Sequence, residues 1–198
     1  MHTDLVALDA LVVRTSVELV STITPADLSR PTPCAGWDLE ALLIHMTAQH
    51  RGFAAAASGH GDDLAAWSPT PFSVRDHAAA AEAVVTAFAA PGVLDRSFAL
   101  PEFGASFPGR LAIGFHLVDY VVHGWDVATS IGARWTPDPA VLAATLPIAR
   151  AVPDGPNRLE AGAAFGPGLP VPADADPLTE ILLRLGRKVS EGADSKDA

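Results

Sequence analysis

The chain has 198 residues, a length that fits one domain or one domain with a small appendage. Hydrophobic residues make up 49% of the sequence and charged residues 18%, which is enough apolar material for a sizeable core. The formal net charge of −10 argues against a nucleic-acid partner, because such a partner is bound largely through its phosphates.

Targeting and redox signals predict a cytoplasmic protein. The first residues, MHTDLVALDALVV, lack a basic region followed by a long apolar run, so we expect no signal peptide. No segment reaches the roughly 20 uninterrupted apolar residues that span a bilayer. The single cysteine, Cys34, excludes an internal disulfide and any site that needs several thiolates. We therefore expect no membrane partner. The expected partner is a small-molecule substrate, and a homodimer is compatible with the sequence.

Hydrophobic periodicity predicts two helices in the first third of the chain. Apolar residues recur every three or four positions between residues 4 and 23, which is the spacing of one helix face. The prolines of the loop RPTPCAGW, residues 30–37, then interrupt the pattern. Asp38 fits the N-cap of a second helix over residues 39–57.

The middle of the chain combines two helices with a short extended segment. Ser73 fits the N-cap of a third helix that continues to about Ala90. Residues 93–108 alternate loosely between Gly and Pro boundaries and predict an irregular hairpin. A fourth long helix is expected over residues 110–131, ended by Gly132.

The last third of the chain predicts one more long helix and a small annex. The fifth helix is expected from residue 138 or 139 to about residue 152. Prolines and glycines make residues 153–172 an extended stretch. Pro177 then fits the first turn of a short helix that reaches about Lys188.

These elements predict a mainly α fold that is divided into three parts. The helical domain would occupy residues 1–155, and a C-terminal extended segment with a short helix would occupy residues 156–190. The small polar residues 191–198 are expected to be a disordered tail. No internal repeat appears in the sequence.

The stretch FHLVDYVVHGWDVA, residues 115–128, carries three polar side chains on one side of the fourth predicted helix. A helix advances about 100° per residue, so His116, Asp119 and His123 share a face. One interpretation is a set of hydrogen-bonded core residues. The other is a divalent cation between Asp119 and His123, which would offset the cost of several kcal/mol for burying a carboxylate.

The second predicted helix supplies a third ligand. His45 lies in an apolar run with Gln49 on the same face, whereas His50 falls about 140° away and is interpreted as a surface or rim residue. Together with Asp119 and His123, His45 would leave coordination positions open, as in catalytic sites. Two imidazoles and a carboxylate suit Zn²⁺, but also Fe²⁺, Ni²⁺, Mn²⁺ or Co²⁺.

Three segments of the chain resemble one protein family. PTPCAGWDLEALLIHM, residues 31–46, resembles the TPC-x-GW loop and following helix of actinobacterial proteins related to mycothiol-dependent maleylpyruvate isomerase. FHLVDYVVHGWDVA resembles the second metal-bearing helix of that family, with its D-x-x-x-HGWDLA run. FGPGLPVPADADPLTEILLRLGRK, residues 165–188, resembles the C-terminal ending of one subgroup of metal-binding proteins in the superfamily.

The resemblance implies a DinB-like four-helix bundle, here with a short hairpin and a small C-terminal annex. In that family a divalent metal, commonly zinc, is held by residues that correspond to His45, Asp119 and His123. The isomerase-type pattern has Glu at the position of Asp119, and the shorter arm could favour a different metal or geometry. Relatives use the metal to activate the thiol of mycothiol toward an electrophile, which implies mycothiol as a co-substrate.

Several single residues have more than one interpretation. Cys34 is either a reactive thiol near a helix N-terminus or a small packed residue, and Trp37 and Trp125 either line the pocket mouth or anchor the core. Asp126 either orients an imidazole, caps a helix end or pairs with Arg134. His116 is interpreted as the catalytic residue, a general base or an outer-shell group, and the alternatives are a fourth metal ligand and a core histidine. The remaining histidines receive no function: His2 at the N-terminus, His60 in a glycine loop and His77 at the start of a surface helix.

Three functions are compatible with these features, and we adopt the first. It is a divalent-metal-dependent enzyme that activates a low-molecular-weight thiol for transfer to, or isomerisation of, a small electrophile. The second is a non-catalytic, metal-stabilised module for ligand binding or dimerisation, and the third is a metal-dependent hydrolase or oxygenase of secondary metabolism. Isomerisation of maleylpyruvate itself is not favoured, because the annex is smaller than the isomerase's C-terminal domain. The arginines that could hold a dicarboxylate are also few, namely Arg51, Arg75, Arg110 and Arg134.

Overall fold

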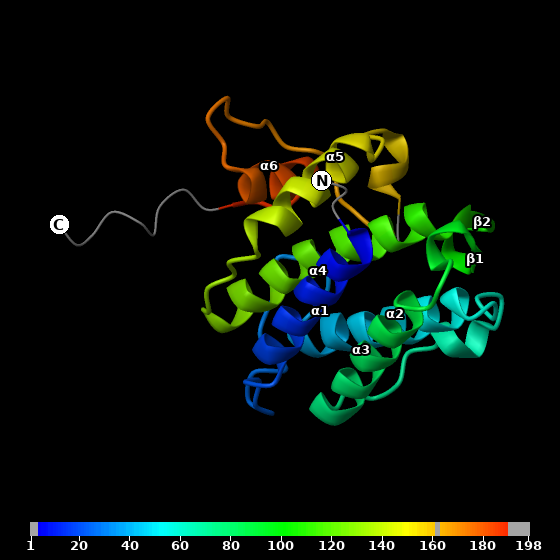
Figure 1. The fold of residues 1–198 in the computed structure, drawn as a ribbon. Coiled ribbons are helices and arrows are strands. Elements are labelled where there is room, and N and C mark those ends of the chain that lie inside the picture. Colours follow the sequence, from blue (N-terminus) through cyan, green and yellow to red (C-terminus); the bar gives the residue numbers. More distant parts are fainter. Residues whose placement is uncertain (1–3, 161–162, 190–198) are drawn as a thin grey trace.

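The computed structural model describes residues 4–160 and 163–189 and shows a mainly helical protein with one small sheet (Figure 1). Each predicted helix and the predicted hairpin are present, although the first and last helices end earlier than expected. The predicted tail and His2 lie outside the described residues. The elements are α1 (Leu5–Val20), α2 (Leu39–Ala57), α3 (Val74–Phe88), β1 (Ser97–Leu100), β2 (Ala105–Pro108), α4 (Gly109–Ile131), α5 (Pro139–Ala151) and α6 (Pro177–Arg184).

Side-chain caps start the helices where the sequence places them. The Asp38 carboxylate accepts a hydrogen bond from the backbone N–H of Ala41 at 2.9 Å. The Ser73 hydroxyl accepts one from Asp76 at 3.1 Å, and Asp138 caps α5 in the same way. Each cap satisfies a backbone donor that has no partner inside its helix.

The end of α6 differs from its prediction in a way that matters for the site. The helix ends at Arg184 rather than near Lys188, because Gly186 takes the left-handed conformation with φ +78°. The backbone N–H of Arg187 bonds back to the Leu182 carbonyl at 2.8 Å, as in a Schellman cap. The turn directs the Arg187 side chain toward α4 instead of continuing the helix.

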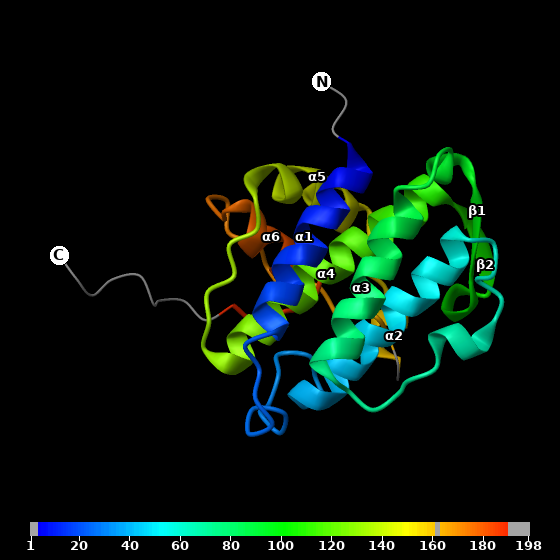
Figure 2. The same cartoon turned by 60° about the horizontal axis from the view of Figure 1, so that its bottom comes forward.

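The four long helices α1–α4 form the body of the protein (Figures 1 and 2). α2 packs with α3, α1 packs with α4 and α3, and α4 also contacts α2. α5 and α6 pack together on the side of the body formed by α1 and α4. The antiparallel β1–β2 hairpin lies at the end where α4 begins. None of the helices in the described ranges is long and apolar enough to cross a membrane.

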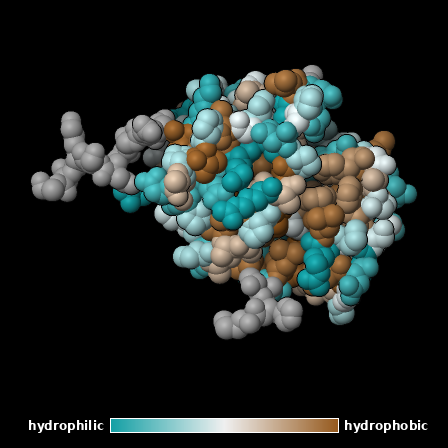
Figure 3. Space-filling model, turned by 90° about the horizontal axis from the view of Figure 1, so that it is seen from above, coloured by the Kyte–Doolittle hydropathy of each residue, from teal (hydrophilic) through white to brown (hydrophobic). Residues whose placement is uncertain are grey.

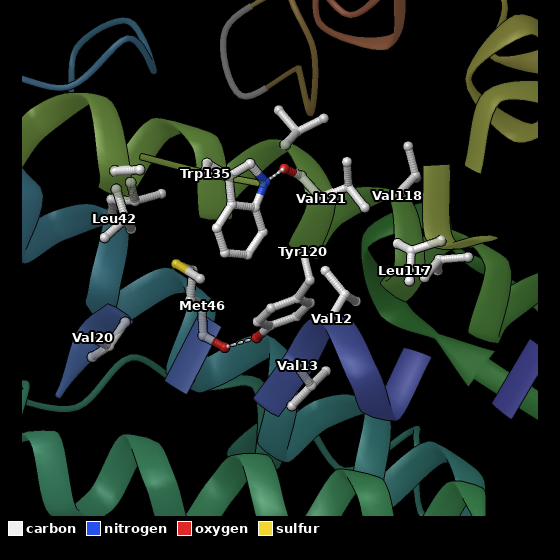
Figure 4. Packing of buried hydrophobic residues seen from close by; sticks show 14 of the residues in the cluster. Val12, Val13, Val20, Leu42, Met46, Leu117, Val118, Tyr120, Val121 and Trp135 are labelled. Atoms are coloured by element: carbon white, nitrogen blue, oxygen red, sulfur yellow. Dashed lines mark hydrogen bonds between the residues drawn. The ribbon is translucent and has the colours of Figure 1, made fainter. Parts of the chain in front are cut away.

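Two aromatic residues tie α4 to its neighbours in the core (Figure 4). Tyr120 is fully buried, and its hydroxyl donates to the backbone carbonyl of Met46 on α2. The Trp135 indole N–H donates to the Val121 carbonyl at 3.0 Å, which folds the chain after α4 back onto that helix. The Tyr120 bond joins α2 and α4, the two helices that carry the predicted metal ligands.

Gly124, in the HGWD run, packs directly against the Trp135 ring. A Cβ atom at Gly124 would lie 2.2 Å from the Trp135 ring, so Gly124→Ala should lower the free energy of unfolding by about 1–3 kcal/mol. Gly114→Ala on the same helix is the matched control, because its Cβ would meet only the end of the Ile148 side chain at 3.3 Å. Urea titration measures both variants. Equal free energies of unfolding for Gly124→Ala and Gly114→Ala would contradict the close packing of Gly124 against Trp135.

Candidate metal centre

The three predicted ligands converge between α2 and α4. One ligand atom from each of His45, Asp119 and His123 lies within 4.8 Å of the other two. His123 Nε2 is 3.3 Å from Asp119 Oδ1, and the rings of His45 and His123 have centroids 5.3 Å apart. His45 and Asp119 are partly exposed whereas His123 is buried, so the group is open on one side. Such a group could hold a divalent cation and leave room for a further ligand.

The far side of the His123 ring is fixed by a buried ion pair. Asp126 Oδ2 lies 2.9 Å from His123 Nδ1, and Arg187 donates to the same carboxylate from Nε at 2.9 Å and from Nη2 at 2.8 Å. Because Asp126 is an acceptor, the proton on His123 belongs on Nδ1 and Nε2 is directed at Asp119. Of the interpretations of Asp126, the structure shows the hydrogen bond to an imidazole.

Arg187 was not among the arginines considered from the sequence. Its carboxylate partner lies 61 positions earlier in the chain, a separation at which no periodicity argument applies. The cation bonded to Asp126 is Arg187 rather than Arg134. The GR pair in the C-terminal ending is the one sequence signal that marks it, since Gly186 allows the turn that places Arg187.

The RPTPCAGW loop forms one wall beside the ligands. The Trp37 ring lies 4.8 Å from the His45 ring and 6.4 Å from the His123 ring, so Trp37 lines the site. Trp37 and Trp125 are both partly buried and pack against the core. Cys34 groups with His123 and Asp126, but that carboxylate is already bonded by Arg187. Burial raises the pKa of the Cys34 thiol, so the structure favours the small packed residue over the reactive thiolate.

The hairpin brings a further carboxyl group to the rim of the site. Gln49, one turn after His45 on α2, donates from Nε2 to Glu102 Oε2 at 3.4 Å. Partial desolvation of the Glu102 carboxyl and the negative charge of Asp119 raise its pKa. No sequence motif includes Glu102. It comes near the site because the hairpin places the turn Pro101–Phe103 there.

Comparison with known proteins decides the family. Residues 10–128, more than half of the chain, match the family described as the mycothiol maleylpyruvate isomerase N-terminal domain. The chain belongs to this family. Two relatives, uncharacterised proteins from two strains of Mycobacterium tuberculosis, are each 29% identical over 179 residues, which cover 86% of this chain and 91% of theirs.

The fold of this family member is also similar to that of a solved structure. The crystal structure of the mycothiol-dependent maleylpyruvate isomerase matches with a TM-score of 0.52 at 16% identity. The match covers 72% of this chain and 66% of the isomerase chain, just under two thirds of its length. The predicted family resemblance and DinB-like helical fold are confirmed.

Two of the three residues in this family member have the protonation state that a cation needs, and His123 carries one extra proton. Burial lowers the pKa of His45 to about 4, so its ring is neutral at pH 7. Burial opposes ionisation of Asp119, but the adjacent His123 lowers its pKa to about 2. Burial likewise opposes protonation of His123, but Asp119 and Asp126 raise its pKa to about 9. The donor set is therefore one neutral imidazole, one carboxylate and one imidazole that holds an extra proton.

Zinc binding should therefore release about one proton per site at pH 7. Metal ligands must be deprotonated, and His123 is the one ligand of the three that carries a displaceable proton at this pH. The apparent affinity should accordingly rise with pH up to about 9. Calorimetric titration in buffers of different ionisation enthalpy counts the protons. Release of none, or of two, would contradict this charge assignment.

His116, the predicted catalytic residue, lies in a second polar group. Its Nδ1 is 2.8 Å from Asp9 Oδ1 on α1, and its Nε2 is 3.3 Å from His50 Nδ1 on α2. All three residues are fully buried. The face of α4 that carries His116 is thus covered by α1, and His116 is not one of the three converging ligands.

Two interpretations of histidines were wrong. His50 is not at the surface or rim but fully buried against Tyr120, with ring centroids 4.1 Å apart. His77 is not on a surface face, because α3 turns it inward to within 2.9 Å of the Thr47 hydroxyl. Thr47 donates its own proton to the Leu43 carbonyl, so His77 Nδ1 is the donor to Thr47.

This buried group should make the metal-free protein acid-sensitive. Burial lowers the pKa of His77 to about 4 and that of His50 well below 6.5, so the unfolded chain binds more protons than the fold between pH 6.5 and 4. The contribution of His77 and His50 to stability is thus full above pH 6.5 and falls as pH drops through this window, by about 1.4 kcal/mol per pH unit for each group. Urea unfolding of wild type and His77→Leu at several pH values tests this. An unchanged pH slope in the variant would exclude His77 as a source.

Proposed function

We propose that this protein is a divalent-metal-dependent enzyme that presents a low-molecular-weight thiol to a small electrophilic substrate. The observation that carries the proposal is the convergence of His45, Asp119 and His123 within 4.8 Å, open on one side. A purely structural metal site would be closed by a fourth protein ligand. Membership of the mycothiol maleylpyruvate isomerase family supports mycothiol, or a thiol like it, as the co-substrate.

Each residue has a part that follows from its position. His45, Asp119 and His123 would hold the metal, most readily Zn²⁺ given two imidazoles and one carboxylate, with Ni²⁺, Fe²⁺ or Mn²⁺ as alternatives. A bound divalent metal lowers the pKa of a coordinated thiol, so that the nucleophilic thiolate forms at neutral pH. Asp126 and Arg187 keep His123 Nε2 directed at the ligand position.

The proton of the thiol needs an acceptor near the rim. Glu102 is the carboxyl group placed for this role. It accepts a hydrogen bond from Gln49, and it is near enough to Asp119 for the charge of Asp119 to raise its pKa. Its raised pKa brings it closer to neutral pH, where proton transfer is most efficient. His116 is assigned a place behind the site rather than contact with a reactant, because Asp9 and His50 occupy both of its ring nitrogens.

The test measures turnover by zinc-loaded protein with mycothiol and two electrophiles, chlorobimane and styrene oxide. The expected result is adduct formation above the uncatalysed rate, lost in His123→Ala. Stoichiometric zinc with no turnover of either electrophile would overturn the proposal in favour of a non-catalytic, metal-stabilised binding or dimerisation module. Turnover that needs dioxygen or water instead of a thiol would overturn it in favour of an oxygenase or hydrolase.

A further inference from the structure

Three phenylalanines form a partly exposed cluster at the hairpin end of the bundle. Phe103 comes from the hairpin turn, Phe107 from β2 and Phe115 from α4, and their ring centroids lie 5.4–5.5 Å apart. Phe103 is 47% exposed, and Leu111, one turn before Phe115, is 46% exposed. Seen from above, hydrophobic residues gather over the right half of the surface, the half that holds the hairpin in Figure 1 (Figure 3).

The cluster lies next to the candidate metal centre along two helices. Phe115 precedes Asp119 by four residues on α4, so the two side chains occupy the same face in successive turns. On α2, Gln49 follows His45 by one turn and donates to Glu102, the residue before Phe103. The hairpin turn is thereby tied to α2, and the phenylalanines extend the site from its ligands toward the hairpin.

The charges around the site select against an anionic substrate. Asp119 and Glu102 are acidic, and Arg187 is not free to hold an anion because its charge is balanced by the buried Asp126. Arg110 lies about 140° around α4 from Phe115 by helix geometry, and it is exposed to solvent there. Apart from the metal itself, a dicarboxylate would therefore meet carboxylates and phenyl rings, whereas an uncharged apolar group would bury surface against the rings.

We propose that Phe103, Phe107 and Phe115 bind the apolar body of the electrophile, and that the substrate is an uncharged molecule with an aromatic or similarly bulky hydrocarbon group. The inference rests on the proposed function, because it assigns the second substrate of the same site. Because Phe115 lies one helix turn from Asp119, an aromatic ring stacked on the cluster would lie beside the metal ligands.

The test compares three electrophiles with zinc-loaded protein and mycothiol: styrene oxide, propylene oxide and maleate. The expected kcat/KM is at least about 10-fold higher for styrene oxide than for propylene oxide, and lowest for maleate. Phe103→Ala and Phe115→Ala should lower kcat/KM for styrene oxide to about the value for propylene oxide, and the zinc content of each variant is measured alongside to show that the metal site is intact. Leu11→Ala, an equally exposed apolar residue on α1, is the matched control and should keep the preference.

A binding measurement without thiol separates this inference from the proposed function. The fluorine NMR signal of 4-fluorostyrene oxide should broaden on addition of zinc-loaded wild type and stay sharp with folded Phe103→Ala and Phe115→Ala. Broadening by wild type alone, without turnover of any electrophile, would leave the subsite and overturn only the thiol-transfer function. Turnover without preference for the aromatic epoxide, or faster turnover of maleate, would overturn the subsite.

Discussion

His123→Ala should weaken zinc binding on the order of 100-fold or more. The variant removes the one ligand that contacts both Asp119 on its metal side and Asp126 on its far side. Structural zinc sites with four ligands bind with about 10–16 kcal/mol, so one ligand accounts for about 3 kcal/mol. The dissociation constant should therefore rise on the order of 100-fold or more, as measured by competition with a chromophoric chelator.

The control for this experiment is a histidine that is not part of the candidate metal centre. His60 is exposed in the loop after α2, and His60→Ala should leave the affinity for zinc unchanged. Asp119→Asn, which keeps the shape of the side chain and removes its charge, should behave like His123→Ala. If His123→Ala bound zinc as tightly as wild type, the metal would have to lie elsewhere in the protein.

Arg187→Met should cost both stability and metal affinity. Asp126 is fully buried, and loss of its guanidinium partner leaves its charge balanced by His123 alone. Breaking one side of a buried ion pair costs about 3–5 kcal/mol, which for a chain of this length lowers Tm on the order of 10 °C. Groups that orient a ligand are worth about 10- to 100-fold in metal affinity, so the affinity should fall by that factor.

A double-mutant cycle distinguishes the ion pair from simple loss of packing. Asp126→Asn combined with Arg187→Met removes both charges, so the double variant should be more stable than the sum of the two single losses predicts. Lys188→Met, which changes the neighbouring exposed cation, should leave both Tm and metal affinity unchanged. Strict additivity of the single effects would show that Asp126 and Arg187 act independently.

The helices could be predicted from the sequence because their signals act between residues that are close in the chain. The N-caps at Asp38, Ser73 and Asp138 act within three residues, and the four-residue spacing of Asp119 and His123 is a property of a single helix. The placement of His45 opposite that pair needed the family resemblance as well, because no local rule specifies which helices pack together.

The features that were missed depend on how the helices cover one another. His50 does lie on a different face of α2 from His45, but that face is packed against α3 and α4 instead of water. An apolar-periodicity argument assigns one buried side to a helix, and an interior helix of a bundle has more than one. Arg187 and Glu102 reach the site from a C-terminal turn and a hairpin, where a change of a few residues in loop length would move them away.

Location of the bound metal tests the central claim most directly. Crystals of the protein grown with zinc would be measured at wavelengths on either side of the zinc absorption edge, and the anomalous difference map would be calculated. We expect one strong peak at bonding distance, about 2 Å, from a nitrogen of His45, a carboxylate oxygen of Asp119 and Nε2 of His123. A zinc-replete protein whose peak lies away from these three side chains would contradict the account.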